Sequence, residues 1–192
     1  IIGASIGLLS AVVGGIVDEV IMRLTEALLS IPFLIFVLLI VSMAGPGLQG
    51  SPWLLIGAVA AVYMPRIARM SRAAAMSVMT RDYVLAARLR GEGAVSIARR
   101  EILPNIAEIL MVEFAVRASY APALIGTLGF LGFGLRPPSP EWGLMIAEYR
   151  NLLTAQPMAV FGPGLMLASL VIGLGFFTEG LSARLGHGMG SR

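Results

Sequence analysis

Two ionisable residues, Glu113 and Arg117, stand four positions apart inside a long apolar stretch of this 192-residue chain. A charged side chain deep in a bilayer is costly, so it usually faces another protein group or a water-filled cavity. A spacing of four residues places the two side chains on one face of a helix, where they can form an ion pair. The spacing leaves two alternatives open: a structural ion pair within a helix bundle, or a charged face that lines a path across the membrane.

The residue types that most enzymes need are absent or badly placed. The sequence has no cysteine and a single histidine, His187, five residues from its end. It also has no lysine, so the phosphate-binding pattern Gly-x-x-x-x-Gly-Lys-Ser/Thr cannot occur. An intramembrane protease is disfavoured because the sequence has no cysteine, no histidine within a span and no paired carboxylates at the proper depth. We therefore expect a chain that catalyses no reaction itself and carries neither a metal site nor a cofactor.

The composition indicates a membrane protein rather than a soluble enzyme. Hydrophobic residues make up 57% of the chain and charged residues only 13%, roughly half the charged share of an ordinary soluble domain. So few charges also exclude a surface that binds nucleic acid. The hydrocarbon core of a bilayer is about 30 Å thick and takes about 20 helical residues to cross. Uncharged runs of that order predict an all-α, polytopic membrane helix bundle.

Five spans follow from the uncharged runs and from the turn formers between them. No charge occurs from Ala27 to Pro65, which is too long for one crossing, and the segment 45–52, Gly-Pro-Gly-Leu-Gln-Gly-Ser-Pro, divides this run. We expect a single transmembrane domain over residues 1–192. Its spans are predicted at about 1–22, 28–44, 53–70, 105–135 and 157–181, with a cytoplasmic loop at about 71–104 and an external loop at about 136–156.

The arginines predict which side each loop faces. All 14 basic residues are arginines, and eight of them lie between Arg66 and Arg100. Because basic residues concentrate in cytoplasmic loops, this loop is predicted to face the cytoplasm. Eleven arginines then lie inside and one within the membrane, while the two outside are Arg136 and Arg150. This orientation puts Ile1 on the outer side, so we expect a sixth span upstream of it.

The loop between the third and fourth spans has the pattern of two short helices. Residues 83–90 have a helix-forming composition, and Gly91 and Gly93 would end that helix. Residues 94–102 can form a second short helix, and Pro104 fits the first turn of the next span. The sequence thus predicts a helix-turn-helix on the membrane surface.

This loop resembles the cytoplasmic loop of the membrane permease subunits of binding-protein-dependent ABC importers. The family pattern is Glu-Ala-Ala, three residues, Gly, and then a spacer before Leu-Pro, and the loop docks into a cleft on the ATPase subunit. Leu85 stands where the family has Glu, and the Ala pair that follows it offers a face with little side chain, which another protein could approach closely. The resemblance implies that the coupling residues are Tyr83, Leu85, Ala86, Ala87, Gly91, Leu103 and Pro104.

A second segment resembles the dipeptide, oligopeptide and nickel branch of that family. Residues 129–145 read Gly-Phe-Leu-Gly-Phe-Gly-Leu-Arg-Pro-Pro-Ser-Pro-Glu-Trp-Gly-Leu-Met. Together with 18–32 and 173–185 the resemblance covers nearly the entire chain, and it is to the second permease of the pair. Prolines cannot continue a helix, so we expect a turn at the outer face. Residues 142–153 would then form a short surface helix on the side where a binding protein docks.

The resemblance implies a type I ABC importer permease (MetI-like) fold in a bacterial cell membrane. The implied partners are a second homologous permease subunit, two ABC ATPase subunits, an external substrate-binding protein, membrane lipid and a peptide substrate. Closure of the ATPases on ATP would move the docked loops and rock the spans in alternating access. Glu113 and Arg117 would then offer charges to peptide termini.

Two other functions remain open at this point. The same architecture could import nickel chelates or another small solute, although no histidine or cysteine lines a span to handle metal. A secondary transporter or channel could instead use Glu113 and Arg117 as its core, but the long basic loop argues against this class.

Overall fold

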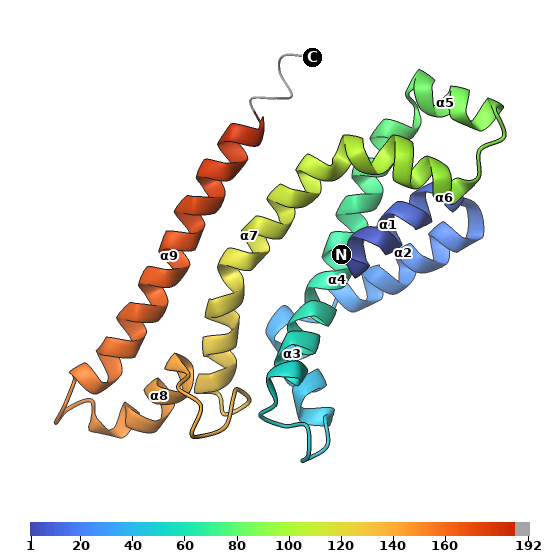
Figure 1. Cartoon of the computed structure of the whole chain (residues 1–192). Coiled ribbons are helices and arrows are strands. Elements are labelled where there is room, and N and C mark those ends of the chain that lie inside the picture. Colours follow the sequence, from blue (N-terminus) through green and yellow to red (C-terminus); the bar gives the residue numbers. More distant parts are fainter. Residues whose placement is uncertain (187–192) are drawn as a thin grey trace. The chain divides into compact units, whose positions relative to one another are not determined.

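Residues 1–186 are described by a computed structural model, and His187 lies outside the described residues. These residues form helices with short connections and no strand (Figure 1), which confirms the all-α class. In chain order the elements are α1 (Ile2–Val13), α2 (Gly15–Leu29), α3 (Phe33–Met43), α4 (Pro52–Met79), α5 (Asp82–Leu89), α6 (Ala94–Ile97), the π-helix η1 (Ala98–Ile102), α7 (Leu103–Phe130), α8 (Trp142–Tyr149), the 3-10 helix η2 (Arg150–Leu152) and α9 (Met158–Gly186).

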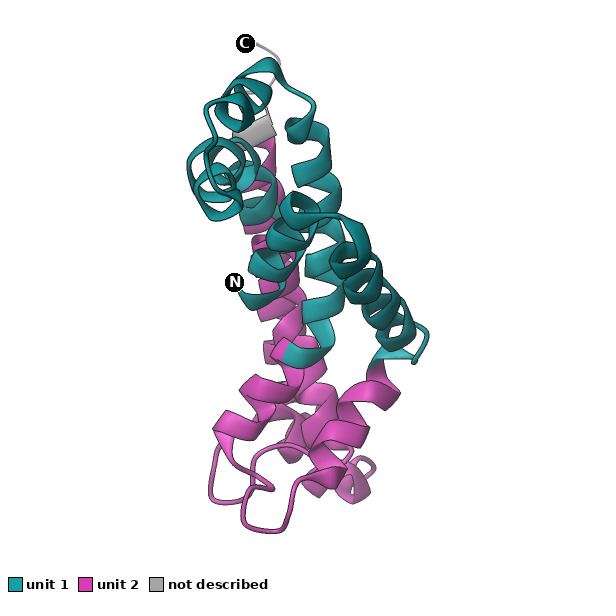
Figure 2. Cartoon of the chain, turned by 90° about the vertical axis from the view of Figure 1, so that its right-hand side faces the viewer, with its two compact units in different colours: residues 1–33, 61–113 teal, residues 34–60, 114–192 magenta. Residues whose placement is uncertain are grey.

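The chain divides into two compact units, which Figure 2 colours teal and magenta. Unit 1 comprises Ile1–Phe33 and Ala61–Glu113, and unit 2 comprises Leu34–Ala60 and Phe114–Arg192. Helices α4 and α7 each contribute one part to both units. That the two units act as one transmembrane domain stays a prediction.

Three helical stretches are long and apolar enough to cross a bilayer, namely Pro52–Met79, Ala94–Phe130 and Met158–Arg184. Helices α2 and α3 reach this length only together, with a bend of 93° between them. Helix α1 is apolar but short, and its 12 residues extend only about 18 Å at about 1.5 Å per residue. Residues 1–186 thus hold three spans by length and composition, or four if the bent pair is one span. The fifth crossing stays a prediction.

The span expected over residues 1–22 is not one continuous helix. Helix α1 ends at Val13, because Gly14 and Gly15 have φ angles of 66° and 61°, a left-handed conformation that favours glycine. Helix α2 then runs through the residues expected to connect the first two spans. It ends before Pro32, since the residue before a proline is disfavoured in helical conformation. The second expected span, 28–44, therefore begins later, at the start of α3.

The fourth expected span, 105–135, also ends early, at the C-terminus of α7. Gly132 has a φ of 84°. Its amide donates to the carbonyl of Gly129 at 3.0 Å, and the amide of Phe133 donates to the carbonyl of Leu128 at 2.8 Å. These two bonds form a Schellman motif, which ends a helix at a left-handed glycine.

Unit 1 packs α1 closely against α4. A Cβ added to Gly7 would overlap the carbonyl oxygen of Ala68, and one added to Gly3 would lie 2.6 Å from that of Met64. Small residues of this kind allow helix backbones to approach closely. Next to this contact lies one hydrophobic core that joins six helical elements, made of Leu8, Ala11, Ala75, Val84, Ala87, Ile97, Ala98, Ile102 and Ile106.

Unit 2 seats α8 against α9 and against the end of α7. A Cβ on Gly143 would overlap the carbonyl oxygen of Gly126, and the Glu141 carboxylate lies against Gly129. Glu141 also caps α8, because its carboxylate accepts hydrogen bonds from the backbone amides of Gly143 at 2.9 Å and Leu144 at 2.7 Å. The expected turn and short helix within 136–156 are confirmed, while their location outside the membrane stays a prediction.

Candidate functional site

The two adjacent alanines of the predicted coupling loop point in different directions. Ala87 is fully buried in the core of unit 1, whereas Ala86 is exposed. The side chains of Tyr83, Leu85 and Leu89 are 41%, 56% and 82% exposed. We call Tyr83, Leu85, Ala86 and Leu89 the α5 outer face. A docking protein could touch this face, whereas Ala87 holds α5 on its own unit.

The turn after α5 depends on Gly91. Its φ is 79°, and no atom would lie within 4 Å of an added Cβ. Its amide donates to the carbonyl of Arg88 at 2.9 Å, and the amide of Glu92 donates to that of Ala87 at 3.2 Å. These are the two bonds of a Schellman motif. The backbone conformation of this turn therefore requires a glycine at position 91. Within the chain, no neighbouring atom comes close enough to exclude a side chain there.

The Glu92 side chain ties this turn together. Its carboxylate accepts a hydrogen bond from Arg90 Nη2 at 2.7 Å and one from the Ser96 hydroxyl at 3.1 Å. The Arg90 guanidinium, and then the Ser96 hydroxyl, hold the pKa of Glu92 below its ordinary value. The turn is thus linked to the first turn of α6 through side chains.

Leu103 and Pro104 lie where η1 continues into α7, within one helical stretch from Ala94 to Phe130. Pro104 is in the first turn of α7, as expected, but helix also precedes it. A proline lacks the amide proton and crowds the carbonyl four residues earlier, and the wider π turn directly before it accommodates this. Asn105 Nδ2 donates to the carbonyl of Glu101 at 2.6 Å. Leu103 and Pro104 are both exposed.

Glu113 and Arg117 are both half-buried on α7. The boundary between the two units falls directly after Glu113, so Glu113 belongs to unit 1 and Arg117 belongs to unit 2. Their common helical face follows from the spacing of four residues on a continuous helix. That this face lines a translocation path stays a prediction.

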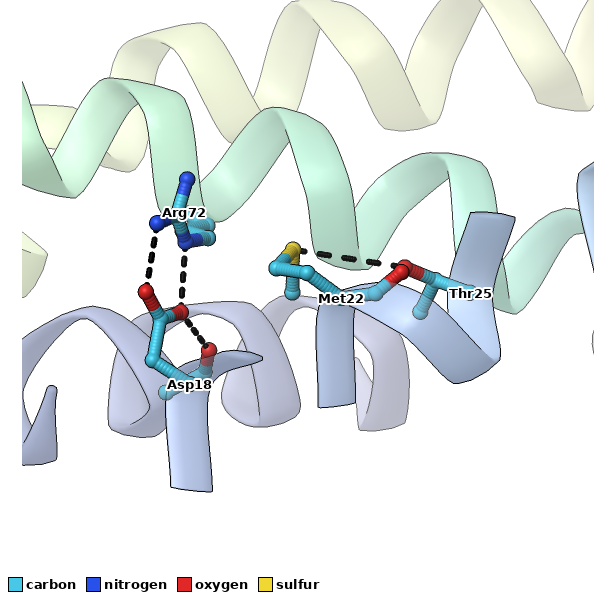
Figure 3. A network of polar contacts seen from close by, with 5 residues as sticks. Asp18, Met22, Thr25 and Arg72 are labelled. Carbon is cyan, nitrogen blue, oxygen red and sulfur yellow. Dashed lines mark hydrogen bonds and ion pairs between the residues drawn. The ribbon is translucent and has the colours of Figure 1, made fainter. Parts of the chain in front are cut away.

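A polar network in unit 1 was missed by the sequence analysis. Asp18 Oδ1 accepts from the Ser10 hydroxyl and from Arg72 Nε, both at 2.5 Å, and its Oδ2 accepts from Arg72 Nη2. Figure 3 shows Arg72 reaching from α4 to Asp18 on α2. The ion pair joins residues 54 positions apart, so no local pattern could have revealed it.

A cavity of about 330 Å³ lies beside this ion pair. It is lined by the α2 residues from Asp18 to Glu26 that face α4, and by Arg69 and Arg72 of α4. Its charges are mixed, and one pair within α2, Arg23 Nη1 to Glu26 Oε2, is 3.1 Å long and exposed. In residues 1–186, no group of three or more metal-ligating side chains is close enough to hold a metal ion.

Comparisons with known proteins identify a family that covers nearly the whole chain. The profile of the family described as "Binding-protein-dependent transport system inner membrane component" matches residues 3–190. The chain is 37% identical, over 93% of its length and 59% of the relative's, to the dipeptide transport system permease protein DppC of Haemophilus influenzae. It is 36% identical, over 93% of its length and 58% of the relative's, to the di/tripeptide transport system permease protein DppC of Pseudomonas aeruginosa. It is 33% identical, over 94% of its length and 59% of the relative's, to the probable D,D-dipeptide transport system permease protein DdpC of Escherichia coli.

The chain therefore spans less than two thirds of the length of these relatives. The family match nevertheless runs over nearly every residue described, including the turn at Gly91 and the segment 129–145. The apolar helices agree with a location in an inner membrane. The chain belongs to the family of inner membrane components of binding-protein-dependent transport systems.

Proposed function

We propose that this chain forms the transmembrane permease part of an ATP-driven importer for di- or oligopeptides. An external binding protein delivers the peptide, and a second homologous permease completes the path. Two ABC ATPase subunits hydrolyse ATP, and this chain catalyses no reaction itself. The peptide substrate is supported by the relatives, whose names describe dipeptide, di/tripeptide and D,D-dipeptide transport.

The observation that carries the coupling role is the exposed outer face of α5. Val84 and Ala87 anchor this helix in the unit 1 core, while Tyr83, Leu85 and Leu89 present apolar surface away from it. A polar face would be expected of a short helix that only meets solvent. A helix fixed on one side, with exposed apolar side chains beside Asp82 and Arg88 on the other, is suited to receive another protein and to transmit its movement to unit 1.

Ala86 provides the sharpest test of docking at this face. In the full-length protein, Ala86→Trp adds a bulky side chain where the ATPase would approach, without disturbing the unit 1 core. We expect copurification of the ATPase subunits with a tagged permease to fall by about tenfold, which corresponds to about 1.4 kcal/mol of binding free energy. The matched control is Ala73→Trp, at an exposed position of α4, which should copurify as the wild type does.

Leu85→Glu is the companion variant. Leu85 is exposed, so a glutamate there buries no charge, and it restores the residue that the family carries. We expect ATPase association and peptide uptake to be retained.

Normal copurification of the ATPases with Ala86→Trp would contradict docking at α5. Uptake of nickel chelates instead of labelled dipeptides would contradict the peptide assignment, and transport without any ATPase would favour a secondary transporter.

We propose that Glu113 and Arg117 lie on the translocation path and meet the charged termini of the peptide. The double variant Glu113→Arg with Arg117→Glu keeps one charge of each sign on the same helical face. It should assemble normally but transport dipeptides with free termini about tenfold more slowly or worse, because a charge-assisted contact is worth at least about 1.5 kcal/mol. Unchanged uptake in this variant would contradict a place on the translocation path and would favour a purely structural ion pair.

A further inference from the structure

The ion pair between Asp18 and Arg72 joins three helices at one carboxylate. Arg72 donates to Asp18 from both Nε and Nη2 (Figure 3). The Ser10 hydroxyl donates to the same carboxylate from α1. A two-bond contact of this kind fixes the direction of both side chains as well as their distance. The network therefore sets where the start of α2 lies against α1 and α4.

This network borders the hydrophobic core on which α5 rests. Ser10 stands between Leu8 and Ala11 of the core, and Arg72 lies one helical turn before Ala75. The same core contains Ala87 of α5. A displacement of α5 therefore acts on α1 and α4 directly beside their contacts with Asp18.

The joint between α1 and α2 has no side chain that fixes its direction. The two helices are joined at Gly14 and Gly15, and no atom would lie within 4 Å of a Cβ on either glycine. Two glycines without packing neighbours leave this joint free to bend. Because the joint itself imposes no direction, the side chain of Asp18 supplies the connection between α2 and α4.

The position of the pair argues against a merely charge-neutralising role. Arg72 lies about 30 Å along α4 from Pro52 at about 1.5 Å per residue, which is about the thickness of the hydrocarbon core. The pair is partly exposed and borders the mixed-charge cavity. Because Arg72 follows the predicted third span, 53–70, both charges would reach water there, and pairing would not be needed to make the arginine tolerable.

We infer that Asp18 and Arg72 are positioning residues that transmit the movement of α5 to α2. The inference rests on the proposed importer function. When the docked ATPases displace α5, the core moves α1 and α4, and the ion pair makes α2 follow. Without the pair, the Gly14–Gly15 joint absorbs the movement, and ATP is hydrolysed without a matching movement of α2.

The test uses the full-length protein assembled with its second permease and two ATPases in proteoliposomes, with the binding protein and a labelled dipeptide. Dipeptide uptake and ATP hydrolysis are measured in the same vesicles. Asp18→Asn and Arg72→Gln should assemble and hydrolyse ATP, while dipeptide transported per ATP falls by at least about fivefold, the lower end of usual coupling between sites. The double variant Asp18→Arg with Arg72→Asp should recover most of that ratio.

A matched control is Arg23→Gln with Glu26→Gln, which removes the exposed ion pair on the same helix and should leave the ratio unchanged. Uptake and hydrolysis falling in proportion in both single variants would overturn the inference, because a merely structural role predicts that result. If Asp18→Asn fails to assemble, Arg72→Lys keeps the charge but loses the two-bond contact, and an unchanged ratio in it would also overturn the inference. A wild-type complex that binds no ATPase would instead contradict the proposed function itself.

Discussion

The two connections that contain a short helix, residues 80–102 in unit 1 and 131–157 in unit 2, use glycine for opposite reasons. Gly91 in the first has a positive φ and open space around it. Gly143 in the second lies at an ordinary φ, but a Cβ there would overlap the carbonyl oxygen of Gly126. One glycine is needed for backbone conformation and the other for room.

Each connection also contains a glutamate, and the two glutamates bond to different kinds of partner. Glu92 bonds to the side chains of Arg90 and Ser96, whereas Glu141 bonds to the backbone amides at the start of α8. The first connection is held by a small core and surface side chains, and the second by direct contact between backbones. This difference suits a loop that moves as a body in unit 1 and a helix that stays fixed in unit 2.

The largest effect is expected for Gly143→Ala. The added methyl meets the backbone of α7, which cannot rotate away, so we expect the free energy of unfolding to fall by about 1–3 kcal/mol, as for overpacked cores. Thermal unfolding of the purified protein in detergent measures this loss. Gly162→Ala, at an open position of α9, is the matched control and should be neutral or stabilising. Equal midpoints for the two variants would break the distinction between the connections.

A smaller effect is expected for Gly91→Val, because the turn demands a left-handed conformation that costs an L residue about 1–2 kcal/mol. Gly91→Asn should lose less, since asparagine tolerates that conformation best among non-glycine residues. The measurements are thermal unfolding and ATPase copurification. Gly93→Ser is the control, because Gly93 caps α6 with a φ of −69°, where serine is a favoured N-cap. If Asn were as harmful as Val, space rather than conformation would be the constraint at Gly91.

The smallest effect is expected at Glu92, and it depends on pH. The Arg90 guanidinium lowers the pKa of Glu92 in the folded state, so the ionised carboxylate stabilises the fold above its unfolded-state pKa. This stabilisation is lost as the pH falls through the lowered folded-state pKa. Thermal midpoints of the wild type and Glu92→Gln should therefore differ slightly at neutral pH and converge below the ordinary range of glutamate. A difference that persists unchanged in acid would show that Glu92 does not act through its charge.

Much of the loop between α4 and α7 could be predicted because its signals are local. Gly91 ends α5, Gly93 precedes α6, and Pro104 stands in the first turn of α7, all as expected. The face on which each alanine lies was not predicted, because that depends on which side of α5 the core covers. The break at Gly14 was missed for a different reason, since an apolar run gives no sign of the φ that its glycines adopt.

The sequence by itself determined the helical class, the membrane location, the family and the short helices of both connections, because hydropathy, proline, glycine and loop motifs act over a few neighbouring residues. Only the tertiary structure decided that Ala87 faces inward, that Gly143 is required by the Gly126 backbone, and that Arg72 pairs with Asp18. Each of these contacts joins segments far apart in the chain. Their existence depends on how helices pack, which no periodicity along one helix encodes.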